Sequence, residues 1–122
     1  MINNKYLNDV AGRMCGIISI QIPSYFVISS SETLSSLNAD SSDMPGEYDR
    51  NSLSTPVVTG NIAKYNGARY TIEAGNDNWI NGLGLFPSSS GADMQTYLLV
   101  PSILHTSTYD LLIEYYITFE RV

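Results

Sequence analysis

The closing segment, residues 109–122 (YDLLIEYYITFERV), alternates between apolar and mixed positions. The odd positions are all aliphatic or aromatic up to residue 119: Tyr109, Leu111, Ile113, Tyr115, Ile117 and Phe119. A period of two predicts a strand with one buried face and one wetter face. Because a strand of this length would recruit another chain at an open sheet edge, we expect it to be central in its sheet or paired across a subunit interface.

Shorter alternating segments precede this strand, and no segment has convincing helical periodicity. Ile18, Ile20 and Ile22 share one face before Pro23 interrupts the pattern, and a second piece runs over residues 25–28. Residues 57–65 and 68–74 flank Asn66-Gly67, and this dipeptide favours the type I′ turn of a β-hairpin.

Two more strands are predicted towards the end of the chain. Residues 79–86 form one, in which Gly82 and Gly84 suggest a bulge or a close backbone approach. Residues 94–100 form the other, ended by Pro101.

Residues 29–56, in contrast, are serine-rich and acidic and read as a long surface loop, with a weak helical signal over 32–37. In all, six to eight short antiparallel strands predict an all-β fold, a β-sandwich or jelly roll with little or no helix. The 122 residues suffice for a single domain, 1–122.

Charge and composition exclude several classes of function. The net charge is -6 with only two lysines, so the surface repels phosphate backbones and direct nucleic-acid contact is not expected. No apolar run reaches the length of a membrane span. The single cysteine, Cys15, lies between apolar neighbours and is predicted to be a buried, inert thiol.

The sequence offers little for catalysis. Its one histidine, His105, lies in a predicted loop beside Thr106 and Ser107, and no Gly-x-Ser-x-Gly elbow accompanies it. One histidine and one cysteine are too few for a zinc site. We therefore expect a solvated histidine and a protein that is not an enzyme.

Acidic residues crowd the long loop. Asp40, Asp43, Glu47 and Asp49 supply the oxygen ligands that calcium prefers. Their spacing does not match an EF-hand, and a plain solvated loop explains them as well. Calcium is therefore an alternative for this cluster, and no other cofactor is expected.

The only tryptophan is a candidate binding residue. Trp79 is flanked by the amides of Asn78 and Asn81, an arrangement on which a lectin could stack and hydrogen-bond a sugar. The simpler interpretation of the ring is an anchor of the core or of a dimer interface.

Residues 55–122, from TPVVTGN through YNGARYTIEAGNDNWINGLGLFPSSS to TYLLVPSILHTSTYDLLIEYYITFERV, resemble the carboxy-terminal part of capsid proteins of small icosahedral RNA viruses. The most specific likeness is to the protruding domain of nodaviruses that infect shrimps and prawns, which is similar in architecture to the tombusvirus protruding domain. The opening MINNKYLNDV lacks the features of a signal peptide and reads as the start of a domain cut from a longer chain.

The resemblance implies a C-terminal capsid domain on the outer surface of a virion, preceded by a shell domain and a basic RNA-binding arm. It implies a homodimeric spike with a structural role, contacts to the rest of the capsid shell, and attachment to a host receptor or glycan. The alternative is a carbohydrate-binding module or lectin with the same β-sandwich fold.

Overall fold

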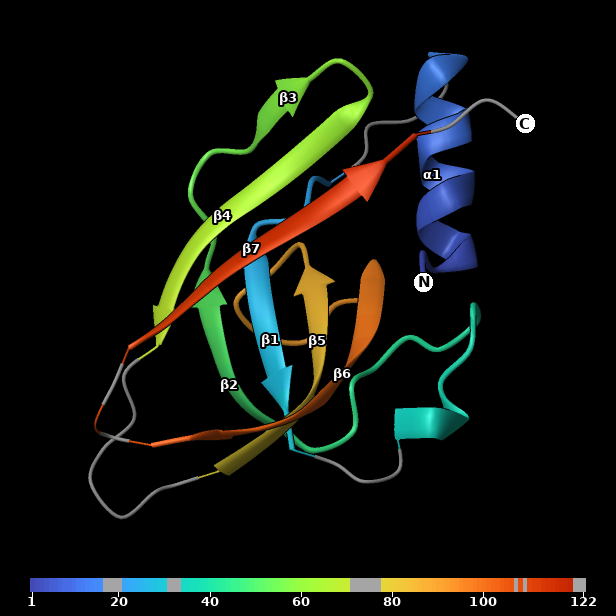
Figure 1. Cartoon of the computed structure of the whole chain (residues 1–122). Helices are drawn as coiled ribbons and strands as arrows, with labels where there is room; N and C mark the ends of the chain where they lie inside the picture. The colour runs from blue at the N-terminus through green and yellow to red at the C-terminus, as the bar shows by residue number, and fades with distance from the viewer. Residues whose placement is uncertain (17–20, 31–33, 71–77, 107, 109, 120–122) are drawn as a thin grey trace.

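A computed structural model describes residues 1–16, 21–30, 34–70, 78–106, 108 and 110–119. Its described part contains two antiparallel sheets stacked as a sandwich, one α-helix and one short 3-10 helix (Figure 1). The all-β prediction is confirmed. The elements are α1 (Asn4–Met14), β1 (Tyr25–Ser29), η1 (Leu34–Ser36), β2 (Glu47–Ser52), β3 (Val57–Thr59), β4 (Ile62–Tyr70), β5 (Asn78–Phe86), β6 (Thr96–His105) and β7 (Leu111–Thr118).

The larger sheet has the order β2-β1-β5-β6 and the smaller one β3-β4-β7. Between them lies the main core, to which both sheets contribute side chains. These are Phe26, Ile28, Ile80 and Leu85 from the large sheet, and Tyr65, Ile113, Tyr115 and Ile117 from the small one. The rings of Phe26 and Tyr115 meet edge to face, with centroids 6.2 Å apart. This contact ties the two layers together.

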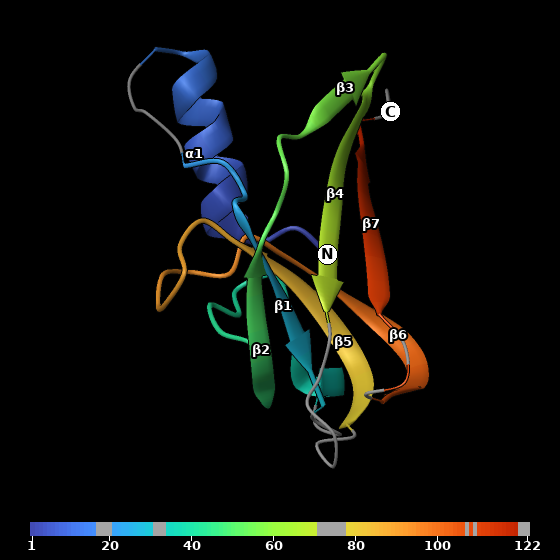
Figure 2. The same cartoon turned by 90° about the vertical axis from the view of Figure 1, so that its left-hand side faces the viewer.

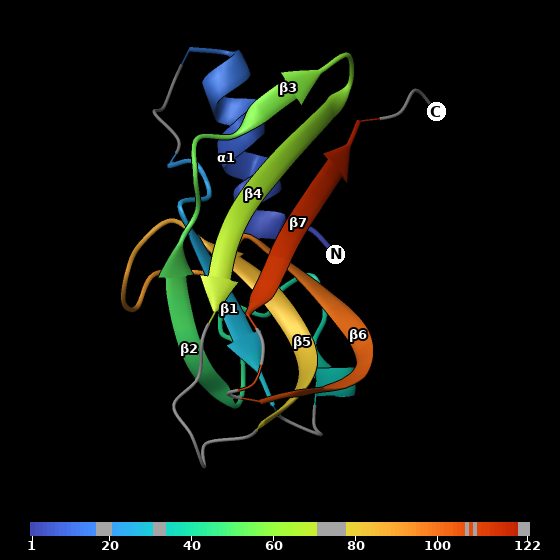
Figure 3. The ribbon, with the colours of Figure 1, turned by 60° about the vertical axis from the view of Figure 1, so that its left-hand side comes forward.

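The closing strand behaves largely as its periodicity predicts. Along β7 the odd residues from Ile113 to Ile117 are buried and the even ones are exposed. One detail was wrong, because Phe119 lies beyond the strand and is 60% exposed. Of the two positions expected for this strand, the centre of the sheet is excluded, because β7 occupies the edge of the small sheet (Figure 3), and pairing across a subunit interface stays a prediction. Tyr109 and residues 120–122 fall outside the described residues.

The predicted hairpin of residues 57–65 and 68–74 around Asn66-Gly67 was wrong, and a different hairpin forms earlier in the chain. β3 and β4 pair around Gly60-Asn61, where Gly60 has φ 61° and so supplies the positive φ of a primed turn. Asn66 and Gly67 instead lie within β4, where the register against β7 shifts between Asn66 and Ala68. Gly67 is the extra residue of a β-bulge, a role that the same conformational freedom permits. The predicted residues 71–74 lie outside the described residues.

A second core lies on the outer face of the large sheet. It joins Val27, Phe86 and Tyr97 of the strands to Leu34 of η1 and to Met44 and Met94 of the loops. A Cβ on Gly82 would lie 2.5 Å from Leu34 Cδ1, and one on Gly84 would lie 2.9 Å from Met44 Cε. The register also shifts between Ile80 and Gly82. The predicted bulge is confirmed beside Gly82, and the atoms that come closest to the two glycines belong to side chains and not to the backbone.

The long loop and the proline stop were partly wrong. Residues 47–52 of the predicted loop form β2, which pairs with β1, and the helical signal over 32–37 amounts to the 3-10 helix η1. β6 continues through Pro101 to His105. Pro101 is tolerated because β6 is an edge strand, where a missing backbone donor leaves no partner unsatisfied. Of the predicted strand before Pro23, residues 17–20 lie outside the described residues.

Helix α1 was missed altogether. Its apolar residues Leu7, Val10, Ala11 and Met14 recur three and four positions apart, as a helix requires, although none of the residues of α1 is fully buried. The end signals were present as well. Asn3 is the N-cap and its side chain accepts a hydrogen bond from Lys5 N at 2.8 Å, while Gly16 follows the C-cap with φ 74°. Cys15, at the C-cap, is exposed, so the prediction of a buried thiol was wrong.

Candidate interaction surface and polar pocket

The two sheets have four outer edges, and among the described strands three are protected against pairing with another chain. β2 carries three charged residues, Glu47, Asp49 and Arg50, and Glu47 and Arg50 form an ion pair. β3 has only three residues. β6 contains Pro101, and its register skips residues opposite β5. Charges, shortness, proline and bulges are the usual devices that block edge pairing.

The N-terminal residues protect β6 further. Ile2 forms an antiparallel bridge with Thr96, Tyr97 N donates to Met1 O at 2.9 Å, and Asn3 N donates to Gln95 O at 2.8 Å. The segment Met1–Asn3 thus acts as an extra strand along the first part of β6.

The edge of β7 is different. It runs for eight residues without proline, and the only bulge in its pairing with β4 belongs to β4. Leu112 is 64% exposed and Tyr116 52% exposed. Glu114 is the one charged residue of β7, and its carboxylate already has two partners within the chain. Lys64 Nζ lies 3.3 Å from it, and Tyr116 Oη donates a hydrogen bond to it at 2.8 Å. The Tyr116 hydrogen bond and Lys64 both lower the pKa of the Glu114 carboxyl.

A groove runs along β7 between the two sheets. It lies on the side of the sandwich where β6 and β7 are both found (Figure 2). Its volume is about 420 Å³. Residues from both sheets and the N-terminus line it: Met1, Ile2, Leu83, Thr96, Leu98, Glu114, Tyr115, Tyr116, Ile117 and Thr118. We call β7 together with this groove the β7 edge surface.

Tyrosines contribute little to the exposed surface of the described residues. Tyr65, Tyr97 and Tyr115 are buried, and the Tyr115 hydroxyl is bonded to Thr96 Oγ1 at 3.0 Å inside the sandwich. Among the tyrosines whose side chains are described, only Tyr116 is exposed. The exposed apolar surface is instead mainly aliphatic, with Leu98, Leu99, Ile103 and Leu104 on β6 and Leu112 on β7.

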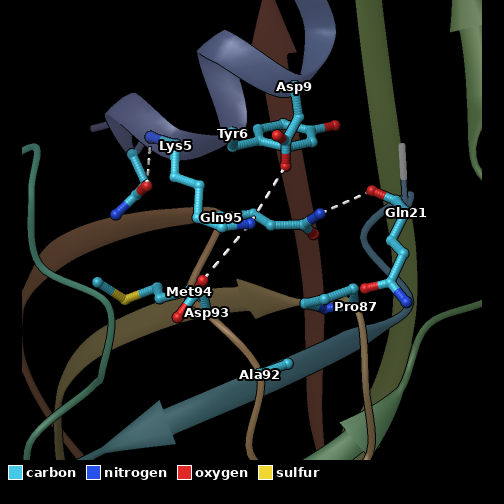
Figure 4. A pocket seen from close by; sticks show the side chains of 10 residues that line it. Lys5, Tyr6, Asp9, Gln21, Pro87, Ala92, Asp93, Met94 and Gln95 are labelled. Carbon is cyan, nitrogen blue, oxygen red and sulfur yellow. Dashed lines mark hydrogen bonds and ion pairs between the residues drawn. The ribbon is translucent and has the colours of Figure 1, made fainter. Parts of the chain in front are cut away.

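A separate polar pocket of about 550 Å³ lies beneath α1 (Figure 4). Helix α1, the segment before β1 and the loop between β5 and β6 each contribute to its walls. The lining residues are Asn3, Lys5, Tyr6, Asp9, Gln21, Pro87, Ala92, Asp93, Met94 and Gln95.

Lys5 lies between two carboxylates at the mouth of this pocket. Its Nζ is 3.4 Å from Asp9 Oδ2 and 3.5 Å from Asp93 Oδ2. The hydrogen bond to Asp9 is the main cause that raises the pKa of Lys5. Deeper in, burial and the hydrogen bond to Tyr65 raise the pKa of Tyr6 to about 12. The phenol of Tyr6 is therefore neutral at physiological pH.

Of the three predicted sugar-binding residues, the structure describes the side chains of Trp79 and Asn81. The Trp79 ring is 54% exposed on β5, as a stacking surface would be. The Asn81 amide, however, donates to Ser30 O at 3.1 Å and accepts from Ser102 Oγ at 2.6 Å. Asn78 begins β5, and its side chain lies outside the described part.

The four acids of the calcium alternative are engaged separately. Asp40 accepts from Asn4 Nδ2 at 2.8 Å, Asp43 accepts from Met44 N at 2.9 Å, and Glu47 pairs with Arg50. Burial raises the pKa of the remaining acid, Asp49. Within the described ranges, no group of three or more His, Cys, Asp or Glu side chains is placed to hold a metal ion.

The histidine prediction was wrong. His105 ends β6 and is fully buried, not solvated in a loop. Sequence reasoning missed it because it took Pro101 as the end of the strand. The polar pocket was missed as well, since its walls come from three segments that are distant in sequence.

No protein-family model matches the chain, and no curated protein or solved structure is significantly similar to it. Among the described residues, no helix is long and apolar enough to cross a membrane.

Proposed function

We propose that this chain is a contact module that pairs with a second copy of itself through the β7 edge surface. The observation that carries the proposal is the unprotected edge: of the four edges described, β7 alone combines length, exposed apolar side chains and the absence of proline. A free edge of this kind binds another strand through main-chain hydrogen bonds.

A second copy is the best-suited partner because β7 is compatible with itself. Two identical edge strands pair antiparallel about a two-fold axis, the commonest symmetry of homodimers. With Tyr115 facing its own counterpart, Glu114 lies opposite Tyr116 of the partner subunit and the like charges of the two Glu114 residues do not meet. Tyr116 already donates to Glu114 within one chain, so the two groups are chemically matched.

The biological role we propose is that of a dimeric spike on the outside of an icosahedral virus capsid, which attaches to a host receptor. The resemblance of residues 55–122 to capsid protruding domains supports this role, as does the net charge of -6, which suits a surface turned away from the packaged genome. Antibodies against this domain are expected to label the outside of intact particles. Labelling only after particles are disrupted would contradict an outward position.

Sedimentation velocity at tens of micromolar tests the pairing. The wild-type chain is expected to sediment as a dimer. Tyr116→Glu sets a new carboxylate opposite Glu114 of the partner subunit, twice by symmetry, and should weaken dimerisation about tenfold or more. Tyr116→Phe keeps the ring and should leave most of the dimer.

Val58→Glu is the matched control. It adds the same charge to the same sheet, at a side chain 73% exposed on the opposite edge strand β3. This variant should remain dimeric. A wild-type chain that is strictly monomeric, or equal loss of the dimer in Val58→Glu and Tyr116→Glu, would refute pairing through β7.

A further inference from the structure

The polar pocket beneath α1 contains an acceptor without a partner. Gln95 is 5% exposed, and its side chain lies across the pocket between α1 and Pro87 (Figure 4). Its Nε2 donates to Gln21 O at 2.7 Å, while its Oε1 is buried and has no hydrogen-bond partner. An unmet buried carbonyl is costly, so the pocket is suited to a ligand that brings a hydrogen-bond donor to it.

The charges of the pocket favour a neutral ligand. Asp9 and Asp93 already share the ammonium of Lys5, so an incoming cation would have to displace Lys5, and an anion would face both carboxylates. Hydroxyl groups suit this arrangement because each can donate to a carboxylate or to Gln95 Oε1 and can accept from Lys5 Nζ.

Several of the other residues that line the pocket are aliphatic or aromatic. Pro87, Ala92 and Met94 contribute aliphatic surface, and the Tyr6 ring forms part of the wall on the helix side (Figure 4). A saccharide has this combination of properties, with hydroxyls around its rim and C–H groups on its faces. The volume of about 550 Å³ is within the usual range of small-molecule sites.

We propose that the polar pocket formed by Lys5, Asp9, Asp93 and Gln95 binds a saccharide unit. The site is distinct from Trp79 and its neighbouring amides. It also goes beyond the proposed pairing function and does not depend on it, because no described residue of β7 lines the pocket.

Titration of the ¹⁵N-labelled chain with glucose, galactose and N-acetylglucosamine, followed in ¹H–¹⁵N spectra, tests the site. At least one of these probes is expected to bind saturably at millimolar concentrations. The shifted amides should be those of residues 3–9 and 92–95. No saturable shift with any of the three sugars, or shifts centred on Trp79, would overturn the proposal.

Variants then distinguish an effect on sugar binding from an effect on folding. Asp93→Ala removes an acceptor whose side chain is 49% exposed, and Gln95→Met removes the buried carbonyl; each should weaken binding about tenfold, the equivalent of one hydrogen bond. Trp79→Ala is the control and should bind as the wild type does. Unchanged affinity in Asp93→Ala would refute the site even if Gln95→Met failed to fold.

The same titration on Tyr116→Glu keeps the two proposals apart. That variant is designed to weaken dimerisation and should bind sugar as the wild type does. A wild-type chain that dimerises but binds no sugar would overturn only the proposal for the pocket. A wild-type chain that binds sugar but does not dimerise would overturn only the proposal of pairing through β7.

Discussion

Arg50 joins β2 to the loop that follows β5, and its removal should be among the most costly single changes. Its side chain is only 9% exposed. Nε and one terminal nitrogen bond the two oxygens of Glu47 at 2.7 and 2.8 Å, while the other donates to Ser88 O at 2.9 Å and Gly91 O at 3.0 Å. The guanidinium also lies 4.1 Å from the centroid of the Phe86 ring.

The substitution Arg50→Met keeps the aliphatic stem and removes all five contacts. Each charge-assisted hydrogen bond contributes about 1.5–3 kcal/mol, but the contributions do not add. Because Glu47 is 28% exposed, water can hydrogen-bond its carboxylate in the variant, and this offsets part of the lost stability. Removing one member of a buried pair costs about 3–5 kcal/mol, and we expect about 3 kcal/mol here.

Urea unfolding followed by tryptophan fluorescence measures this loss. With a slope of about 1.5 kcal/mol/M for a chain of this size, the midpoint should fall by about 2 M. Lys5→Met is the control, because it breaks ion pairs whose lysine is 63% exposed and should change the midpoint little. A fall of less than about 0.5 M for Arg50→Met would show that this network does not hold the loop.

Three further changes are predicted. Tyr115→Phe removes the buried hydrogen bond with Thr96 and should lower the free energy of unfolding by about 1 kcal/mol, measured in urea, with the dimer retained. Gly84→Val forces a side chain against Met44 and should cost about 1–3 kcal/mol in the same assay; a neutral result would contradict the close approach. Because the pKa of Tyr6 is raised from 10.0 to about 12, its contribution to stability should be complete below pH 10 and lost between pH 10 and 12, a pH dependence that Tyr6→Phe should remove.

The closing strand and the fold class could be predicted because they depend on local chemistry. Alternation in residues 111–118 separates a buried face from an exposed one wherever the strand lies, so the pattern specifies which side chains enter the core. Gly82 and Gly84 were likewise informative, because a missing side chain inside a strand leaves room that a neighbour fills.

Other local signals were ambiguous between two structures. Asn66-Gly67 suits a hairpin turn or a bulge equally well, and the pairing of β4 along its whole length with β7 selects the bulge. Pro101 ends a central strand but is accepted on an edge strand, so its effect depends on where β6 lies in the sheet. Helix α1 has cap residues and a short apolar period that was overlooked, and its position against the sandwich is set by contacts with distant segments.

The sequence by itself determined the alternation, the all-β class and the acidic surface, since these follow from side-chain type and spacing along the chain. Only the tertiary structure decided that β7 lies at an open edge, that His105 is buried and that Gln95 meets Asp9 and Asp93 around one pocket. Strand order and pocket composition depend on which distant segments pack together. That choice is made by the total burial and hydrogen bonding of the whole chain, and no local pattern records it.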